Sequence, residues 1–161
     1  MSKGKSRGKI DCKEILDGAL FIGSAKASKN LDGLKQMQIT HIVCLAGKEW
    51  FPGEFSYLTS HFPDDPNVNI LEKLPEILSF IDAAIGKNGK VLVHCMGGMS
   101  RSPTVVVAYL MHSQKMELNQ AVEFVQQKRP ATRLKPGFLQ QLKYLHSIHS
   151  EEGEEEKSES I

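Results

Sequence analysis

A seven-residue segment between a cysteine and an arginine constrains this chain more than any other part of it. The β-branched run Val91-Leu92-Val93 leads into the segment, and Cys95 and Arg101 stand at its two ends. Ser102-Pro103 and a long apolar stretch follow. Serine is a favourable N-cap and proline suits the first helical turn, so we expect a helix to begin at Ser102. The pattern predicts a strand, a tight loop and a helix in direct succession.

The residues of this loop suit the binding of a phosphate dianion. Gly97 and Gly98 carry no Cβ, so the backbone can curl and turn its N–H groups inward. The following helix directs its partly positive N-terminal end at the loop, and Arg101 can hold two phosphate oxygens. Such cationic surroundings favour the thiolate of Cys95, placed for in-line attack on phosphorus. The alternative, a buried strand cysteine beside a surface arginine, leaves the glycines and the Ser-Pro pair unexplained.

Hydrophobic periodicity indicates strands early in the chain and helices late. Short apolar or β-branched segments predict strands at residues 19–23, 40–45, within 55–62, and at 91–94. Apolar residues at helical spacing predict helices around residues 31–37, 71–85, 105–111, 121–125 and 138–148. Pro75 interrupts the second of these, so either that helix begins nearer Lys73 or its first turns are kinked. The order of elements predicts an α/β domain.

The composition is that of a soluble globular domain whose charges are segregated at its ends. The chain has 161 residues, 40% hydrophobic and 24% charged, and a formal net charge of +1, which selects neither nucleic acid nor an acidic membrane as partner. Residues 1–14 are basic and residues 150–161 acidic, and we expect a disordered head and tail around a domain at residues 15–149. No apolar run approaches the ~20 residues of a membrane span. Three cysteines without framework spacing indicate a reducing compartment, the cytosol or nucleus.

The loop resembles that of the cysteine-dependent protein phosphatases, and its ending Gly98-Met99-Ser100-Arg101-Ser102 resembles the dual-specificity branch. The likeness covers roughly residues 15–146 and extends to other segments of that family: its opening strand and first helix (21–25 with Asn30 and Leu34), its second strand (39–43), the helix after the loop (108–111) and the closing helix (137–138 with 141–142).

This resemblance implies a fold, an activity and a class of partner. The fold would have a central, mostly parallel sheet of about four to five strands flanked by helices, as in the protein tyrosine phosphatases. The activity would be hydrolysis of phosphotyrosine, phosphoserine and phosphothreonine in phosphorylated proteins, without metal or other cofactor. We expect a monomer.

The resemblance also assigns roles to residues of this chain. Cys95 would be the nucleophile, and Asp64 the general acid and base, because the family spacing from Tyr57 to Asp82 continues without a gap; Asp65 is the fallback. Ser102 would hydrogen-bond the sulfur, and His94 would support the loop. The phosphate would be held by Arg101 together with backbone N–H groups of the loop, that is, by Met96, Gly97, Gly98, Met99, Ser100 and Arg101.

The chain departs from the family pattern at two places. Gly97 stands where the family often has alanine, a small change that loosens the loop. Leu134-Lys135 replaces the usual Pro-Asn pair before Gly137-Phe138. The asparagine of that pair helps to brace the site, so the bracing of the site in this chain is left open.

Three other functions share parts of the pattern. A phosphatase for phosphoinositide, RNA 5′-phosphate or glucan phosphate would use the same chemistry, but neutral Met96 and Met99 stand where the lipid phosphatases carry lysines. A phospho-binding pseudophosphatase usually lacks the nucleophile, the arginine or the acid. A rhodanese or arsenate reductase has a similar loop but lacks the Ser-Arg-Ser ending.

Cys44 raises a further hypothesis. It ends the predicted strand that would run beside the one leading into the loop, so a reversible Cys44–Cys95 disulfide could shield the nucleophile from over-oxidation. The alternative is a cysteine packed as an apolar strand residue.

Overall fold

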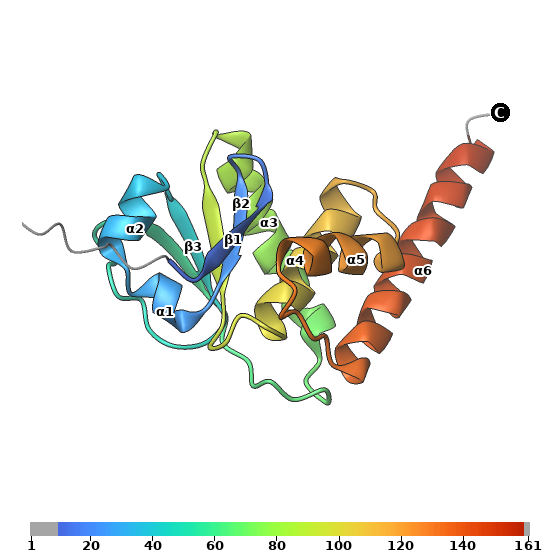
Figure 1. Cartoon of the computed structure of the whole chain (residues 1–161). Coiled ribbons are helices and arrows are strands. Elements are labelled where there is room, and N and C mark those ends of the chain that lie inside the picture. The colour runs from blue at the N-terminus through green and yellow to red at the C-terminus, as the bar shows by residue number, and fades with distance from the viewer. Residues whose placement is uncertain (1–9, 160–161) are drawn as a thin grey trace, which may run out of the picture.

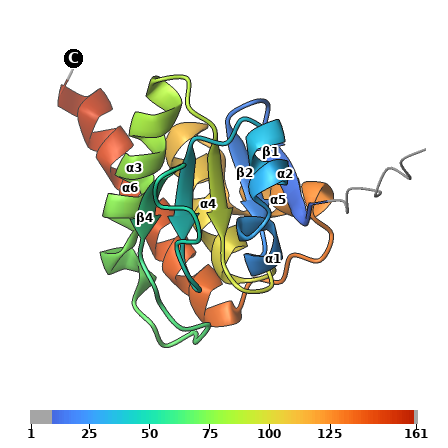
Figure 2. The same cartoon turned by 90° about the vertical axis from the view of Figure 1, so that its left-hand side faces the viewer.

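A five-stranded sheet with helices on both faces forms the centre of the molecule (Figures 1 and 2). The computed structural model describes residues 10–159, with side chains as far as Ile148. The strand order is β1-β2-β5-β3-β4; β1 is antiparallel to β2 and the other neighbours are parallel. The predicted α/β class with a mostly parallel sheet is confirmed. The strands are β1 (Cys12–Leu16), β2 (Leu20–Gly23), β3 (His41–Cys44), β4 (Ser56–Thr59) and β5 (Val91–His94).

Two helical layers cover the sheet, as Figure 1 shows. The short helices α1 (Ala25–Ser28) and α2 (Leu31–Gln36) lie on one face, where Leu34 packs against Phe21, Ile42 and Leu92. The other face carries α3 (Leu74–Gly86), α4 (Arg101–Ser113), α5 (Leu118–Lys128) and α6 (Pro136–Glu159). With both faces covered, β2 and β5 are buried throughout, and apolar runs are typical of such strands.

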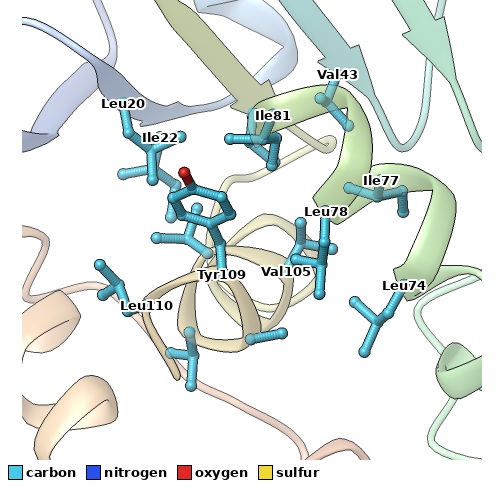
Figure 3. Packing of buried hydrophobic residues seen from close by; sticks show 14 of the residues in the cluster. Leu20, Ile22, Val43, Leu74, Ile77, Leu78, Ile81, Val105, Tyr109 and Leu110 are labelled. Atoms are coloured by element: carbon cyan, nitrogen blue, oxygen red, sulfur yellow. The ribbon is translucent and has the colours of Figure 1, made fainter. Parts of the chain in front are cut away.

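Helix α4 is the centre of the larger apolar core, as its composition predicted. Its residues from Ser102 to Met111 are all buried. Figure 3 shows Tyr109 of α4 directed toward Leu20 and Ile22 of the sheet and Val105 beside Leu78 of α3, all within one apolar cluster. The phosphate loop, residues 95–101, is therefore anchored on a buried strand and a buried helix.

The helix after the loop begins one residue earlier than predicted. Arg101 is its first residue and Ser100 its N-cap, whose carbonyl accepts the hydrogen bond from Thr104 N at 3.0 Å. Ser102 does not cap the helix, because its side chain points at the sulfur of Cys95 instead.

Pro75 lies in the first turn of α3, where its missing N–H has no consequence. The helix begins at Leu74 with Lys73 as its N-cap, which confirms the first of the two alternatives. A single 3₁₀ turn, η1 (Ile70–Glu72), precedes it.

Both predicted disordered ends were assigned too broadly. The head was wrong from Cys12 onward, because residues 12–14 belong to β1, an edge strand that faces Lys13 and Glu14 outward and buries Ile15; residues 1–9 lie outside the described residues. The tail was wrong as far as Glu159, because α6 continues to that residue. Glutamate and lysine are good helix formers, and a helix that has already begun adds residues easily. Among the described residues, no helix is long and apolar enough to cross a bilayer.

Candidate active site

The phosphate loop wraps its backbone around the sulfur of Cys95. Gly98 N lies 3.2 Å and Ser102 N 3.5 Å from Sγ, and Ser102 Oγ lies 3.3 Å from it, as predicted for that hydroxyl. The buried sulfur therefore lies in a shell of hydrogen-bond donors made by the loop backbone and the Ser102 hydroxyl.

Gly98 could not be another residue in this loop. Its φ is +69°, and a Cβ built there would lie 2.7 Å from both Arg129 Nη2 and Gly23 O. The left-handed conformation turns the Gly98 N–H toward the sulfur and its carbonyl outward.

Arg129 holds the outer side of the loop, a role that the sequence did not reveal. Its Nε donates to Gly98 O at 2.8 Å and its Nη2 to Gly97 O at 3.1 Å. The side chain is only 8% exposed, and Nη1 pairs with Asp11 Oδ1 at 3.2 Å. A hydrogen bond from Ser24 and then the Arg129 guanidinium hold the pKa of Asp11 below its ordinary value. Arg129 thus satisfies the carbonyls that the loop directs away from the phosphate site.

Asp64, Cys95 and Arg101 line one cavity of about 360 Å³ at the carboxyl end of β5. Asp65 is absent from the described lining, and its Oδ1 instead accepts a hydrogen bond from Asn67 N at 2.9 Å. The structure therefore brings Asp64, and not Asp65, to the predicted nucleophile. The cavity is lined by Asp64, Cys95, Gly97, Met99, Ser100, Arg101, Arg133, Leu134, Lys135 and Pro136.

The start of α6 fixes residues 60–69, called the acid loop because it carries Asp64 and Asp65. Gln141 bonds the end of this loop and the residue after it, donating to Val68 O at 2.8 Å and accepting from Ile70 N at 2.8 Å. Gly137 lies so close to Pro66 that a Cβ at Gly137 would be 2.4 Å from the Pro66 Cβ. The position of the acid loop is thus set by a segment that follows it by about 70 residues.

Two cations reach the acid loop from the cavity side. Arg101 Nη1 donates to Phe62 O at 3.0 Å, which leaves its other N–H groups for a phosphate. Lys135 Nζ lies 3.4 Å from Asp64 Oδ2 and also donates to the backbone carbonyl of Asp64. Lys135 stands where the family has its bracing asparagine, and here it braces the site through its contacts with Asp64.

His94 is buried and uncharged. Its Nδ1 lies 3.2 Å from Cys95 O, so Nδ1 carries the proton, while Nε2 has no hydrogen-bond partner among the described residues. Burial lowers the pKa of His94, which keeps the ring neutral. The ring fixes the backbone of Cys95 and does not face the cavity.

The sheet turns the Cys44 side chain away from Cys95. Val43 and Leu45 belong to the same core cluster as Cys95, so Cys44, which lies between them, faces the opposite side. Its Sγ donates to Ala46 O at 3.3 Å and lies 3.7 Å from His61 Nε2. Burial raises the pKa of the Cys44 thiol. These contacts are those of the alternative, a cysteine packed as an apolar strand residue, and the disulfide stays a hypothesis for the oxidised protein.

The two methionines of the loop extend toward solvent. Met96 is 54% and Met99 49% exposed, so the rim of the cavity carries apolar side chains where a lysine would serve extra phosphates. Within the described part of the chain, no three His, Cys, Asp or Glu side chains cluster closely enough to hold a metal ion.

Comparison with known proteins finds relatives that all belong to one family. The family model for the dual specificity phosphatase catalytic domain matches residues 20–147. Dual specificity protein phosphatase 1B of Arabidopsis thaliana is 42% identical over 134 residues, which span 82% of this chain and 80% of the relative. Dual specificity protein phosphatase 19 of Mus musculus is 40% identical over 126 residues, 77% of this chain and 57% of the relative.

Solved structures show the same fold. The human tyrosine phosphatase-like serine/threonine/tyrosine-interacting protein superimposes with a TM-score of 0.83 at 34% identity, covering 88% of this chain and 99% of the other. A mouse putative dual specificity phosphatase complexed with zinc tungstate gives a TM-score of 0.86 at 26% identity, covering 95% and 97%.

Proposed function

Because the chain belongs to the dual specificity phosphatase family and is thus a protein phosphatase, we propose that it hydrolyses phosphotyrosine, phosphoserine and phosphothreonine. In this proposal Cys95 is the nucleophile, Arg101 holds the phosphate, and Asp64 is the general acid and base. The observation that carries this proposal is the shared cavity of these three side chains, with the sulfur inside a shell of donors.

The first step transfers the phosphoryl group to sulfur. The Cys95 thiolate attacks phosphorus, forming an S–P bond while the bond to the leaving oxygen breaks. Protonated Asp64 delivers its proton to that oxygen, and the alcohol or phenol departs. Arg101 and the inward N–H groups of residues 96–101 hold the three equatorial oxygens, and preorganised donors of this kind are usually the largest catalytic contribution.

The second step returns the enzyme to its starting state. The Asp64 carboxylate takes a proton from a water molecule, whose oxygen attacks the phosphorus of phosphocysteine. The S–P bond breaks and inorganic phosphate forms. The hydroxyl of Ser102, 3.3 Å from the sulfur, stabilises the departing thiolate.

Three residues support this machinery without touching the phosphorus. Lys135 holds Asp64 over the cavity and faces its carboxylate once the proton has left. Arg129 holds the loop carbonyls outward, so that the N–H groups stay inward. Neutral His94 fixes the backbone at Cys95. We assign all three as positioning residues.

The partners that we propose are phosphorylated proteins, and the proposed location is the cytosol or nucleus. Three free cysteines, one of them the nucleophile, fit a reducing compartment. The catalytic domain extends from β1 into α6 and so includes residues that the sequence had assigned to a disordered head.

Trapping of the intermediate tests the mechanism. Ser102→Ala removes the hydroxyl assigned to the departing thiolate and should slow the second step, so rapid quenching after mixing with a ³²P-labelled phosphopeptide should leave label on Cys95. Phosphotyrosine and phosphothreonine peptides should both give this label. Label on another residue would contradict the assignment of the nucleophile. Turnover confined to phosphoinositides or RNA 5′-phosphates would contradict the proposed substrate.

A further inference from the structure

An exposed tryptophan near the phosphate loop carries two lysines on its ring. Trp50 is 41% exposed, and the ammonium nitrogens of Lys29 and Lys48 lie 5.0 Å and 5.4 Å from its ring centre. Both distances fall within the range of cation–π attraction. These three residues are named the Trp50 surface.

The segments that carry Lys29 and Lys48 adjoin the phosphate loop at Met96. Lys29 caps α1, whose first residue, Ala25, donates its N–H to Met96 O at 2.9 Å. Lys48 follows Gly47, where a Cβ would lie 3.9 Å from the Met96 sulfur. Figure 2 shows α1 beside the loop that joins β5 to α4. Met96, the residue after Cys95, is thus the point of the phosphate loop nearest to both segments.

The two ammonium groups have no carboxylate within ion-pair distance among the described residues. Two acidic side chains that follow Lys48 in the sequence are engaged elsewhere. Glu49 accepts a hydrogen bond from Thr59 at 2.6 Å, and Glu54 pairs with Lys35 at 2.7 Å. Two like charges held at one ring repel each other unless an anion lies between them. The arrangement is therefore complementary to a negatively charged group.

We propose that the Trp50 surface binds acidic residues that flank the phosphorylated residue of a protein substrate. The inference rests on the proposed function and adds a substrate class to it: phosphoproteins with Asp, Glu or a second phosphorylated residue near the target. The chemistry favours a peptide over single-stranded nucleic acid, because bases stack on open aromatic faces and this ring already carries two lysines.

The test compares matched phosphotyrosine peptides in which three flanking residues are Glu, Gln or Lys. The readout is the ratio of kcat/KM for the Glu peptide to that for the Gln peptide, measured at low salt for each variant. Two exposed ion pairs predict a ratio of about five, expressed mainly in KM and reduced by added salt. A double substitution, Lys29→Gln with Lys48→Gln, should bring the ratio close to one.

The matched control removes two lysines from the other end of the molecule. Lys87 and Lys115 follow the carboxyl ends of α3 and α4, and both are exposed. Their double substitution to Gln should retain the wild-type ratio. Trp50→Leu should lower the ratio, because the lysines lose the ring that holds them.

Peptide affinities of Cys95→Ser separate this inference from the proposed function. If the wild type is inactive, the proposed function fails. The ratio of the affinities of Cys95→Ser for the Glu and Gln peptides still decides whether the Trp50 surface binds acidic residues. A ratio unchanged by removal of Lys29 and Lys48, or lost equally in the control, would overturn the inference. Preference for the Lys peptide would overturn it as well, as would tighter binding of RNA or of anionic vesicles than of the Glu peptide.

Discussion

Replacement of Lys135 by methionine should slow the enzyme only where the leaving group needs a proton. The variant keeps the apolar stem of the side chain and removes the ammonium that contacts Asp64 at both its carboxylate and its backbone carbonyl. Its effect should therefore be transmitted through the general acid. The phosphate loop should bind phosphate as before.

The size of the effect follows from the exposure of the pair. The Lys135 and Asp64 side chains are 39% and 37% exposed, so solvent screens the ion pair to about 0.2–1 kcal/mol. The hydrogen bond to the Asp64 carbonyl adds about 1 kcal/mol. Together, about 1–2 kcal/mol corresponds to a loss of about fivefold to thirtyfold in kcat/KM.

The assay compares phenyl phosphate, a poor leaving group, with a difluoro-methylumbelliferyl phosphate, a good one, at the pH optimum of each variant. Lys135→Met should show the full loss on phenyl phosphate and less than about a twofold loss on the good leaving group. Lys143→Met, an exposed lysine of the same helix, serves as the control and should match the wild type on both.

A double-mutant cycle gives the sharpest refutation. In an Asp64→Asn background no general acid remains, so adding Lys135→Met should cost nothing further. Equal losses on the two leaving groups would refute the assignment of Lys135 as a positioning residue for Asp64. A full additional loss in the Asp64→Asn background would do the same.

Three further predictions concern buried groups. Arg129→Met should weaken competitive inhibition by inorganic phosphate at least about tenfold and should lower the Tm. The reason is that two loop carbonyls lose their donors and the Asp11 carboxylate loses its partner. Unchanged inhibition would refute the role of Arg129. Burial lowers the folded-state pKa of His94, so below its ordinary pKa of 6.5 the unfolded chain binds more protons than the folded chain. The Tm should therefore fall more steeply from pH 7 to 5.5 in the wild type than in His94→Gln. Parallel curves of Tm against pH would count against a buried neutral ring. After peroxide treatment, peptide mapping should find oxidation on Cys95 and an unmodified Cys44, and a disulfide between them would show that the two side chains can reach each other.

The sequence predicted the centre of the site because that centre is local. Cys95 and Arg101 are fixed by a strand, a glycine-containing loop and a helix that follow one another directly. The buried strand β5 and helix α4 could also be predicted from the sequence, since both are apolar almost throughout. Asp64 was predicted through family spacing, and it, rather than Asp65, lines the cavity with Cys95 and Arg101.

The outer parts of the site could not be predicted because they depend on long-range contacts. Arg129 reaches loop carbonyls more than 30 residues away and a carboxylate, Asp11, that the sequence had placed in a disordered head. The side of the sheet that Cys44 faces depends on register, and a shift of one residue reverses it. Lys135 was visible as a departure from the family, but its contact with Asp64 arises only from the packing of α6 against the acid loop.

The hydrolysis of para-nitrophenyl phosphate in the presence of a metal chelator tests the central claim most directly. Wild-type protein, kept reduced, should turn the substrate over, and Cys95→Ser should be inactive while retaining the circular dichroism spectrum and Tm of a folded domain. Turnover that survives in Cys95→Ser would contradict the cysteine mechanism. A folded, reduced wild type without turnover would show instead a protein that binds phosphate without hydrolysing it.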